Sequence, residues 1–280
     1  MIAWALAFVI WFLGWWINGR LAQSVYSDTR AISLAIPVIF GATLIAMWQV
    51  LVTMLDISAV ILPAPSAIAV RFIDSIPILF ADFVQTIIKG ALVGFIFGMI
   101  AAFAVAVLAD RSPFLTRGIL PVGSFMAALP IVGTAPIFVK WFGSDWESKA
   151  AVVAVMVFFP ILVNTVAGLR DTTAMQRDLM RTYAAGYWET LFKLRLPAAL
   201  PFIFNGLKIS ATLALIGAIV AEFFGSPTVG MGFRISTSVG QLAMDMVWAE
   251  IVVAALAGSS LYGAIALLEK RVTFWHPSQR

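Results

Sequence analysis

The chain has 280 residues, of which 62% are hydrophobic and only 11% are charged. A soluble globular domain carries about 25% charged residues, because its surface must be solvated by water. The composition therefore excludes an ordinary soluble enzyme, and the high hydrophobicity equally excludes a disordered chain. The sequence contains no Cys, which excludes disulfides, thiol nucleophiles and Cys-ligated zinc. These features predict a protein whose main solvent is lipid.

Long stretches of the sequence carry almost no Asp, Glu, Lys or Arg. A helix needs about 20 apolar residues to cross about 30 Å of hydrocarbon. Continuous apolar runs favour helices, because the strands of a membrane barrel alternate in polarity. We therefore predict an all-α, polytopic membrane protein, with spans at residues 1–19, 31–55, 90–109, 118–139, 150–169, 209–225 and 251–268.

The distribution of Lys and Arg predicts the orientation, because cytoplasmic loops carry an excess of these residues. If the second run starts in the cytoplasm, most of the 18 basic residues lie inside, and only a few lie outside: Arg71, Lys140, Lys149 and Arg234. This orientation predicts a cytoplasmic C-terminus and outer segments at 145–147 and 226–245. No basic residue precedes the first run, so we interpret it as a retained helix whose N-terminus lies outside.

Residues 170–208 form a long predicted cytoplasmic segment that is rich in basic residues. Four apolar residues recur there at every fourth position, which predicts one short amphipathic helix: Leu179, Tyr183, Tyr187 and Leu191. We expect Pro197 and Pro201 to end this helix and to set a new chain direction. A basic amphipathic helix lying on the anionic membrane surface is an alternative interpretation of the same pattern.

The sequence offers no catalytic constellation. It contains no HExxH, no GxSxG and no paired-carboxylate motif, and its one His, His276, lies close to the C-terminus. It also contains no GxxxxGK[ST] loop, so ATP would have to be bound by another chain. We predict no catalytic residue, no metal site and no cofactor, and the scattered basic residues argue against binding to nucleic acid.

A few residues inside the runs are candidates for a solute pathway. Charges inside a span are costly, and proline bends a helix, so both mark positions that bear on function. We predict a cavity near the bilayer midplane that is lined by Met126, Pro130 and Glu222. A structural or gating role is the alternative for Glu222.

Small residues recur at every fourth position in the third run. Gly90, Gly94 and Gly98 form a doubled small-xxx-small pattern, which allows two membrane helices to approach closely. The pattern predicts tight helix packing and no chemistry.

The segment from Asp178 to Pro201 reads DLMRTYAAGYWETLFKLRLPAALP and resembles the EAA signature of permease subunits in bacterial ABC importers. That signature has EAA, three residues, Gly, nine residues, an aliphatic residue, one residue and then Leu-Pro. Here Leu194 and Pro197 match it, the Gly position falls on Ala184, and the EAA positions fall on residues 178–180. Further stretches are similar to the nitrate/sulfonate/taurine branch of these type I permeases: LPAPSAI (62–68), FNGLKIS (204–210), AEFF (221–224) and GMGFRIS (230–236).

The resemblance covers residues 35–270 and implies an organisation. It implies an importer domain of six core helices at 31–270 with a coupling segment at 170–208, preceded by an additional helix and basic linker at 1–30 and followed by a cytoplasmic tail at 271–280. Two copies would form the pathway across the inner membrane, a separate ATPase would dock on the coupling segment, and a periplasmic or lipid-anchored binding protein would deliver the solute. The residues implied to couple to the ATPase are Asp178, Arg181, Tyr183, Ala184, Ala185, Gly186, Tyr187, Leu194 and Pro197.

The implied solute is a small organic compound or anion of the nitrate, sulfonate or taurine type, or a pyrimidine precursor or riboflavin. A stand-alone secondary carrier or channel is the main alternative, although that class would carry more intramembrane charge and no docking segment. A multi-pass membrane enzyme is a further alternative, and it would need a polar cluster at membrane depth that the sequence does not reveal.

Overall fold

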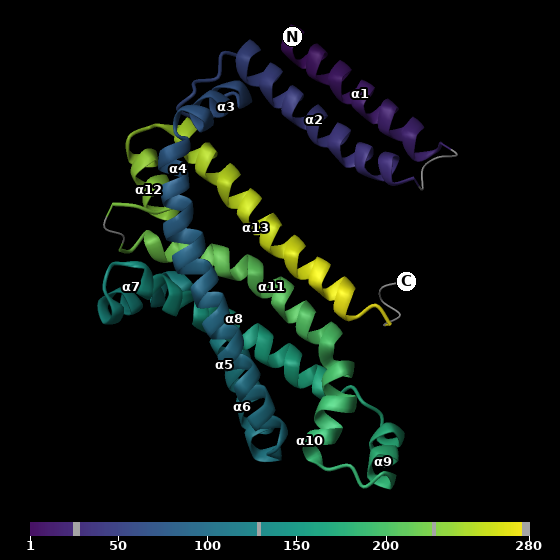
Figure 1. The fold of residues 1–280 in the computed structure, drawn as a ribbon. Helices are drawn as coiled ribbons and strands as arrows, with labels where there is room; N and C mark the ends of the chain where they lie inside the picture. Colours follow the sequence, from purple (N-terminus) through teal and green to yellow (C-terminus); the bar gives the residue numbers. More distant parts are fainter. Residues whose placement is uncertain (25–28, 128–129, 226–227, 276–280) are drawn as a thin grey trace. The chain divides into compact units, whose positions relative to one another are not determined.

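The structure is a computed structural model that describes residues 1–24, 29–127, 130–225 and 228–275 (Figure 1). The described residues form helices and no strands. In chain order the α-helices and the two π-helical segments (η) are α1 (Ile2–Ala22), α2 (Arg30–Met54), α3 (Pro65–Asp74), α4 (Ile76–Phe83), η1 (Val84–Leu92), α5 (Val93–Asp110), α6 (Pro113–Ala127), α7 (Ile131–Phe142), α8 (Trp146–Arg170), α9 (Ala174–Thr182), α10 (Tyr187–Thr190), η2 (Leu191–Arg195), α11 (Leu196–Glu222), α12 (Met231–Gly240) and α13 (Met244–Val272).

Six helices among the described residues are long and apolar enough to cross a bilayer. Two of them join several segments without a break: α4, η1 and α5 form one helix of 35 residues, and α10, η2 and α11 form one of 36. The other four are α1, α2, α8 and α13. The predicted all-α, polytopic fold is therefore confirmed.

The predicted span at residues 118–139 is wrong in one respect, because this run forms two helices. α6 ends at Ala127, and α7 begins at Ile131 with Pro130 as its N-cap residue. Proline has no N–H to donate, so it is tolerated at the start of a helix far better than inside one. With 15 and 12 residues, neither helix alone is long enough to cross about 30 Å of hydrocarbon.

The chain divides into two compact units. The first contains Met1–Ile76 and Thr237–Glu250, and the second contains Pro77–Ser236 and Ile251–Arg280. Because α1 packs along α2, the contacts group these two helices together (Figure 1). The sequence-based division places them in different domains, and it stays a prediction.

A side chain of α2 fixes the start of α3 within the first unit. Gln49 accepts a hydrogen bond from the Ser66 N–H and donates one to the Ser66 hydroxyl, both at 3.0 Å. Pro65 occupies the first turn of α3, where its missing N–H costs nothing. The LPAPSAI stretch is thus a helix start that another helix caps.

The core of the second unit lies around α8, which packs against both α5 and α11. Glycines allow the close approach: a Cβ at Gly94 would lie 2.6 Å from the Cβ of Val153, and one at Gly98 would lie 3.0 Å from the Cα of Ala154. The predicted tight packing of the third run is therefore confirmed at these two glycines. The buried side chains of α8 at this core are Val153, Val157, Ile161, Leu162 and Val166.

Candidate functional site

The predicted coupling segment contains two helices where the sequence predicted one. α9 begins with a capping box, in which Thr173 and Gln176 each bind the other's backbone N–H. It ends with Tyr183 as its C-cap residue, and a second helix begins at Tyr187. The four apolar residues at every fourth position therefore do not lie on one helix, and the prediction of a single amphipathic helix is wrong.

The chain turns between these helices through Ala184, whose φ of 51° is in the left-handed region. The N–H of Ala184 donates to the carbonyl of Arg181 at 2.8 Å, and the N–H of Ala185 donates to that of Met180 at 3.0 Å. These two bonds form a Schellman motif, which glycine ordinarily completes. In the EAA signature Gly stands at the position of Ala184, so the signature and the backbone conformation agree.

Replacing Ala184 with Gly is expected to stabilise the protein. The left-handed backbone conformation costs a residue with a Cβ about 1–2 kcal/mol. Glycine avoids this cost but loses about 0.5–1 kcal/mol of the gain, because its unfolded chain has more conformational entropy. The expected gain is about 1 kcal/mol, or roughly 2–4 °C in Tm, measured by thermal unfolding in detergent. Ala185→Gly is the control and should lower Tm, because Ala185 has no left-handed strain to relieve. A lower Tm for Ala184→Gly would contradict this account of the turn.

The tip of the coupling segment is open to the surroundings. Ala184 and Gly186 are exposed, Ala185 is half-buried, and a Cβ built at Gly186 meets nothing within 4 Å. The Tyr183 side chain is 76% exposed. Asp178 and Arg181 are both exposed and pair with each other at 3.3 Å. The predicted coupling residues on this side of the turn thus form an uncovered surface on the single chain.

The prolines of the segment lie inside a continuous helix, so the prediction that they end it is wrong. Pro197 lies in the first turn of α11 and Pro201 lies further inside it. The π-helical turn η2 directly precedes Pro197, and Leu194, within η2, is half-buried like Pro197. A π-turn changes the pairing of the backbone carbonyls at the point where Pro197 offers no N–H. The helix that begins at Tyr187 therefore continues through η2 into α11 without a break.

A buried ion pair ties this helix to two others. The Arg195 guanidinium donates to both carboxylate oxygens of Asp110, at 2.8 and 2.5 Å, and its Nε donates to the carbonyl of Leu169 at 2.9 Å. The Tyr187 hydroxyl also donates to Asp110, at 2.9 Å. The side chains of Arg195 and Asp110 are only 15% and 5% exposed. We call Asp110, Tyr187, Arg195 and the Leu169 carbonyl the Asp110 joint.

Sequence reasoning did not single out the Asp110 joint. The signal in the sequence was Asp110, which directly follows the run 90–109, together with Arg195, which lies between two leucines of the signature. Opposite charges at the predicted cytoplasmic ends of two spans could have been paired on that basis. Arg111 adds to the cluster, because its guanidinium lies 4.6 and 4.4 Å from the ring centroids of Tyr187 and Trp188.

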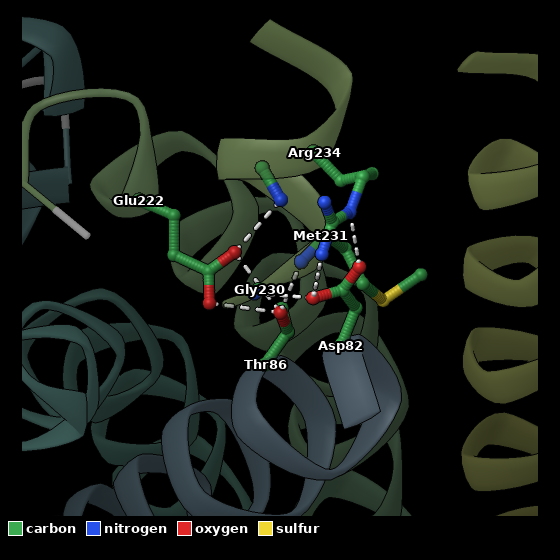
Figure 2. Close-up of polar contacts among 7 residues, drawn as sticks. Asp82, Thr86, Glu222, Gly230, Met231 and Arg234 are labelled. Atoms are coloured by element: carbon green, nitrogen blue, oxygen red, sulfur yellow. Dashed lines mark hydrogen bonds and ion pairs between the residues drawn. The ribbon is translucent and has the colours of Figure 1, made fainter. Parts of the chain in front are cut away.

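A second polar cluster lies at the opposite end of α11, and Figure 2 shows its members pointing toward one another. Three successive N–H groups at the start of α12 are bound by side chains of other helices: Gly230 by Asp82 at 2.6 Å, Met231 by Thr86 at 2.8 Å and Gly232 by Glu222 at 2.7 Å. The Thr86 hydroxyl donates to Glu222 at 2.8 Å, and the Arg234 Nε donates to Asp82 at 2.8 Å. We call this cluster the α12 anchor.

The α12 anchor is buried and depends on glycine. Asp82 and Thr86 are fully buried, and Glu222 is 2% exposed. Gly230 has a φ of 136°, and a Cβ there would lie 2.6 Å from the Glu222 carboxylate carbon. The AEFF and GMGFRIS stretches are in direct contact through Glu222 and Gly232. The sequence could not show the whole cluster, because Asp82 and Thr86 lie far from both stretches in the chain.

The same end of the bundle is held by a buried lysine. Lys149, 1% exposed, donates from its Nζ to the carbonyls of Ser144 and Gly225. The Gln85 side chain donates to Asp145 at 2.8 Å, and Asp145 also caps α8. The bond from Gln85, followed by that from the Trp146 N–H, lowers the pKa of the exposed Asp145 carboxyl below its ordinary value. These contacts connect η1, α8 and the residues after α11.

The predicted pathway residues have different surroundings. Glu222 is engaged in the α12 anchor, which favours the structural alternative for this residue. Pro130 is exposed at the start of α7. The side chain of Met126 lies outside the described residues. The pathway itself stays a prediction.

Comparison with known proteins agrees with this architecture. Residues 94–274 match the family described as binding-protein-dependent transport system inner membrane component. The chain is 30% identical over 243 residues to the formylaminopyrimidine transport permease protein ThiX of Halalkalibacterium halodurans, covering 87% of the chain and 96% of the relative. It is 31% identical over 237 residues to the riboflavin transport system permease protein RibX of Chloroflexus aurantiacus, covering 84% and 88%. It is 28% identical over 269 residues to the taurine transport system permease protein TauC of Escherichia coli, covering 93% and 96%.

The family match spans most of the chain, and it includes nearly all of α5, α8, α11, the coupling segment, the Asp110 joint and the α11 and α12 residues of the α12 anchor. Each of the three relatives is named a transport permease, and six helices of this chain are suited to cross a membrane. The chain therefore belongs to the binding-protein-dependent transport system inner membrane component family, as a multi-pass permease of the type I ABC importer class in its sulfonate/taurine branch.

Proposed function

We propose that this chain is the membrane subunit of an ATP-driven importer, that two copies of it form the solute pathway, and that a separate ATPase docks on the coupling segment. The observation that carries the proposal is the uncovered tip at residues 183–186, held out by the Schellman turn at Ala184. The residues at the tip have small side chains, so the tip is narrow enough to enter a groove on a partner. The chain has no P-loop, so hydrolysis of ATP belongs to that partner.

The proposed orientation puts the coupling segment and the C-terminus in the cytoplasm and the α12 anchor on the outer side. The excess of Lys and Arg around the coupling segment supports this, since Arg170, Arg177, Arg181, Lys193 and Arg195 all lie within it. A soluble or lipid-anchored binding protein would then reach the α12 end. Solute would enter there and leave near the coupling segment.

The proposed solute is a small organic molecule with polar or ionised groups. Three relatives are named for formylaminopyrimidine, riboflavin and taurine, which share this character. The low charge of the spans supports an organic solute over a bare inorganic ion, because a bare ion would need more compensating charge along its path. Selection among such solutes would belong mostly to the binding protein.

Gly186→Glu tests the docking proposal. A side chain at Gly186 has open space in the single chain, so the variant should fold and reach the membrane normally. A charged side chain in a docked groove loses its hydration, so we expect the ATPase to co-purify at least about tenfold less, equivalent to about 1.4 kcal/mol. Gly186→Ala is the matched control and should bind the ATPase almost as the wild type does. Undiminished co-purification and uptake in Gly186→Glu would contradict docking at this tip.

A further inference from the structure

We infer that Asp110 and Arg195 are positioning residues that pass the motion of the coupling segment to α5 and α8. The inference rests on the proposed function, because it needs an ATPase that moves this segment. It assigns a role to residues that lie outside the exposed docking tip.

The geometry of the Asp110 joint suits this role. Arg195 uses its planar guanidinium for both oxygens of Asp110 and for the Leu169 carbonyl, so three of its donors are fixed at once. A bidentate pair resists rotation as well as separation. Asp110 is the last residue of α5, and Leu169 lies in the last turn of α8. One side chain of the coupling helix thus holds the ends of two membrane helices.

Two other ion pairs of the described coupling segment differ from the Asp110 pair: Lys208, inside α11, pairs with Glu269 of α13 at 2.8 Å, and one pair stays within its own helix. Glu189 and Lys193 pair within one helix at 3.0 Å, with side chains that are 55% and 69% exposed. Exposed pairs of this kind contribute little, because water screens them. The Asp110 pair is almost buried, and Tyr187 of the same joint packs against a buried apolar cluster that contains Leu169 and Leu191. The Asp110 pair joins the start of the long helix 187–222 to the end of α5, next to the proposed docking tip.

The displacement has a continuous route to the other end of the membrane. Asp110 ends the helix that begins at Ile76, and that helix carries Asp82 and Thr86 of the α12 anchor. At 1.5 Å per residue, Asp82 and Asp110 are about 40 Å apart along this helix. A shift of α5 at the Asp110 joint therefore acts on the side chains that hold the start of α12.

The test uses the complex of this chain with its co-purifying ATPase in proteoliposomes. Because the chain has no Cys, Ser236→Cys places a single thiol on an exposed position of α12. The rate of maleimide labelling is measured with and without ATP and orthovanadate, which hold the ATPase closed. With native Asp110 we expect ATP and vanadate to change the labelling rate. In Asp110→Asn we expect the ATP-dependent change in labelling rate to be smaller by about fivefold or more, which is within the usual range of coupling between sites. ATPase co-purification should stay as in the wild type.

Glu189→Gln is the matched control, because it removes a carboxylate of the same long helix as Arg195 whose ion pair stays within that helix. It should keep the full ATP-dependent change. If Asp110→Asn reduces the amount of folded protein, Arg195→Lys replaces it, because lysine keeps the charge but cannot hold Asp110 in the same fork. The inference would be overturned if a folded Asp110 or Arg195 variant kept the full ATP-dependent change in labelling rate. It would also be overturned if the labelling rate did not change with native Asp110 while the ATPase is bound. Failure of the ATPase to bind the native chain would instead refute the proposed function.

Discussion

Gly98→Leu should separate α5 from α8 and lower the stability of the protein by about 3 kcal/mol or more, at the upper end of the penalties for overpacking. A Cβ at this position would lie 3.0 Å from the Cα of Ala154, and it would also meet the Ala154 carbonyl and the Val157 side chain. Backbone atoms cannot rotate away, so the helices themselves must move apart. Thermal unfolding in detergent should show a Tm lower by about 6–12 °C, at about 2–4 °C per kcal/mol.

Gly41→Leu is the control for this experiment. Gly41 lies inside the membrane-crossing helix α2, and a Cβ there meets nothing within 4 Å. The same substitution should therefore change Tm only slightly. Equal losses for both variants would show that the penalty comes from the change of residue type and not from the contact between α5 and α8.

The glycine pattern could be predicted because helix packing in a membrane is largely a local property of the sequence. A small residue every fourth position marks one face, and the face does not depend on which helix covers it. Gly94 and Gly98 behave as predicted. Their partner could not be predicted in the same way, because the choice of α8 depends on long-range packing.

Helix lengths were predicted less well, because the apolar runs were ended at charged residues. The third run was expected to begin at Gly90, whereas the helix begins at Ile76 and includes Asp82 and Lys89. Asp82 is tolerated inside the helix because Gly230 and Arg234 bind its carboxylate. That compensation comes from residues far along the chain, and no local pattern reveals it.

The coupling segment shows where periodicity alone misleads. A four-residue spacing continues from α9 into α10, but the backbone turns at Ala184, and the only break signal in the sequence is Gly186, two residues later. The resemblance to the EAA signature held the missing information, since it expects Gly at this position. The prolines misled in the opposite sense, because the π-turn before Pro197 allows the helix to continue.

In the α12 anchor, one hydroxyl bridges two other elements. Thr86 Oγ1 accepts from the Met231 N–H and donates to the Glu222 carboxylate. Thr86 is fully buried, so neither partner can turn to water if the hydroxyl is removed. These bonds also serve the start of α12, where the first N–H groups have no carbonyl of their own helix to bind.

Thr86→Val should therefore destabilise the protein by about 2–4 kcal/mol. Valine keeps the shape of threonine, but it leaves one N–H and one carboxylate oxygen without a partner, and each unsatisfied group costs about 1–3 kcal/mol. The loss should appear as a lower Tm in detergent and as faster proteolysis between α11 and α12.

Thr165→Val supplies the matched comparison. Thr165 is also buried, at 1% exposure, but its hydroxyl has no hydrogen-bond partner among the described residues. The same change of atoms there removes an unsatisfied group, so it should leave Tm unchanged or raise it. The two variants differ only in what the hydroxyl binds, and opposite signs would assign the stability of this end to the bonds of the α12 anchor. If both variants lost stability equally, the hydroxyl of Thr86 would have no more effect than any buried threonine, and the anchor would not hold α12 in place.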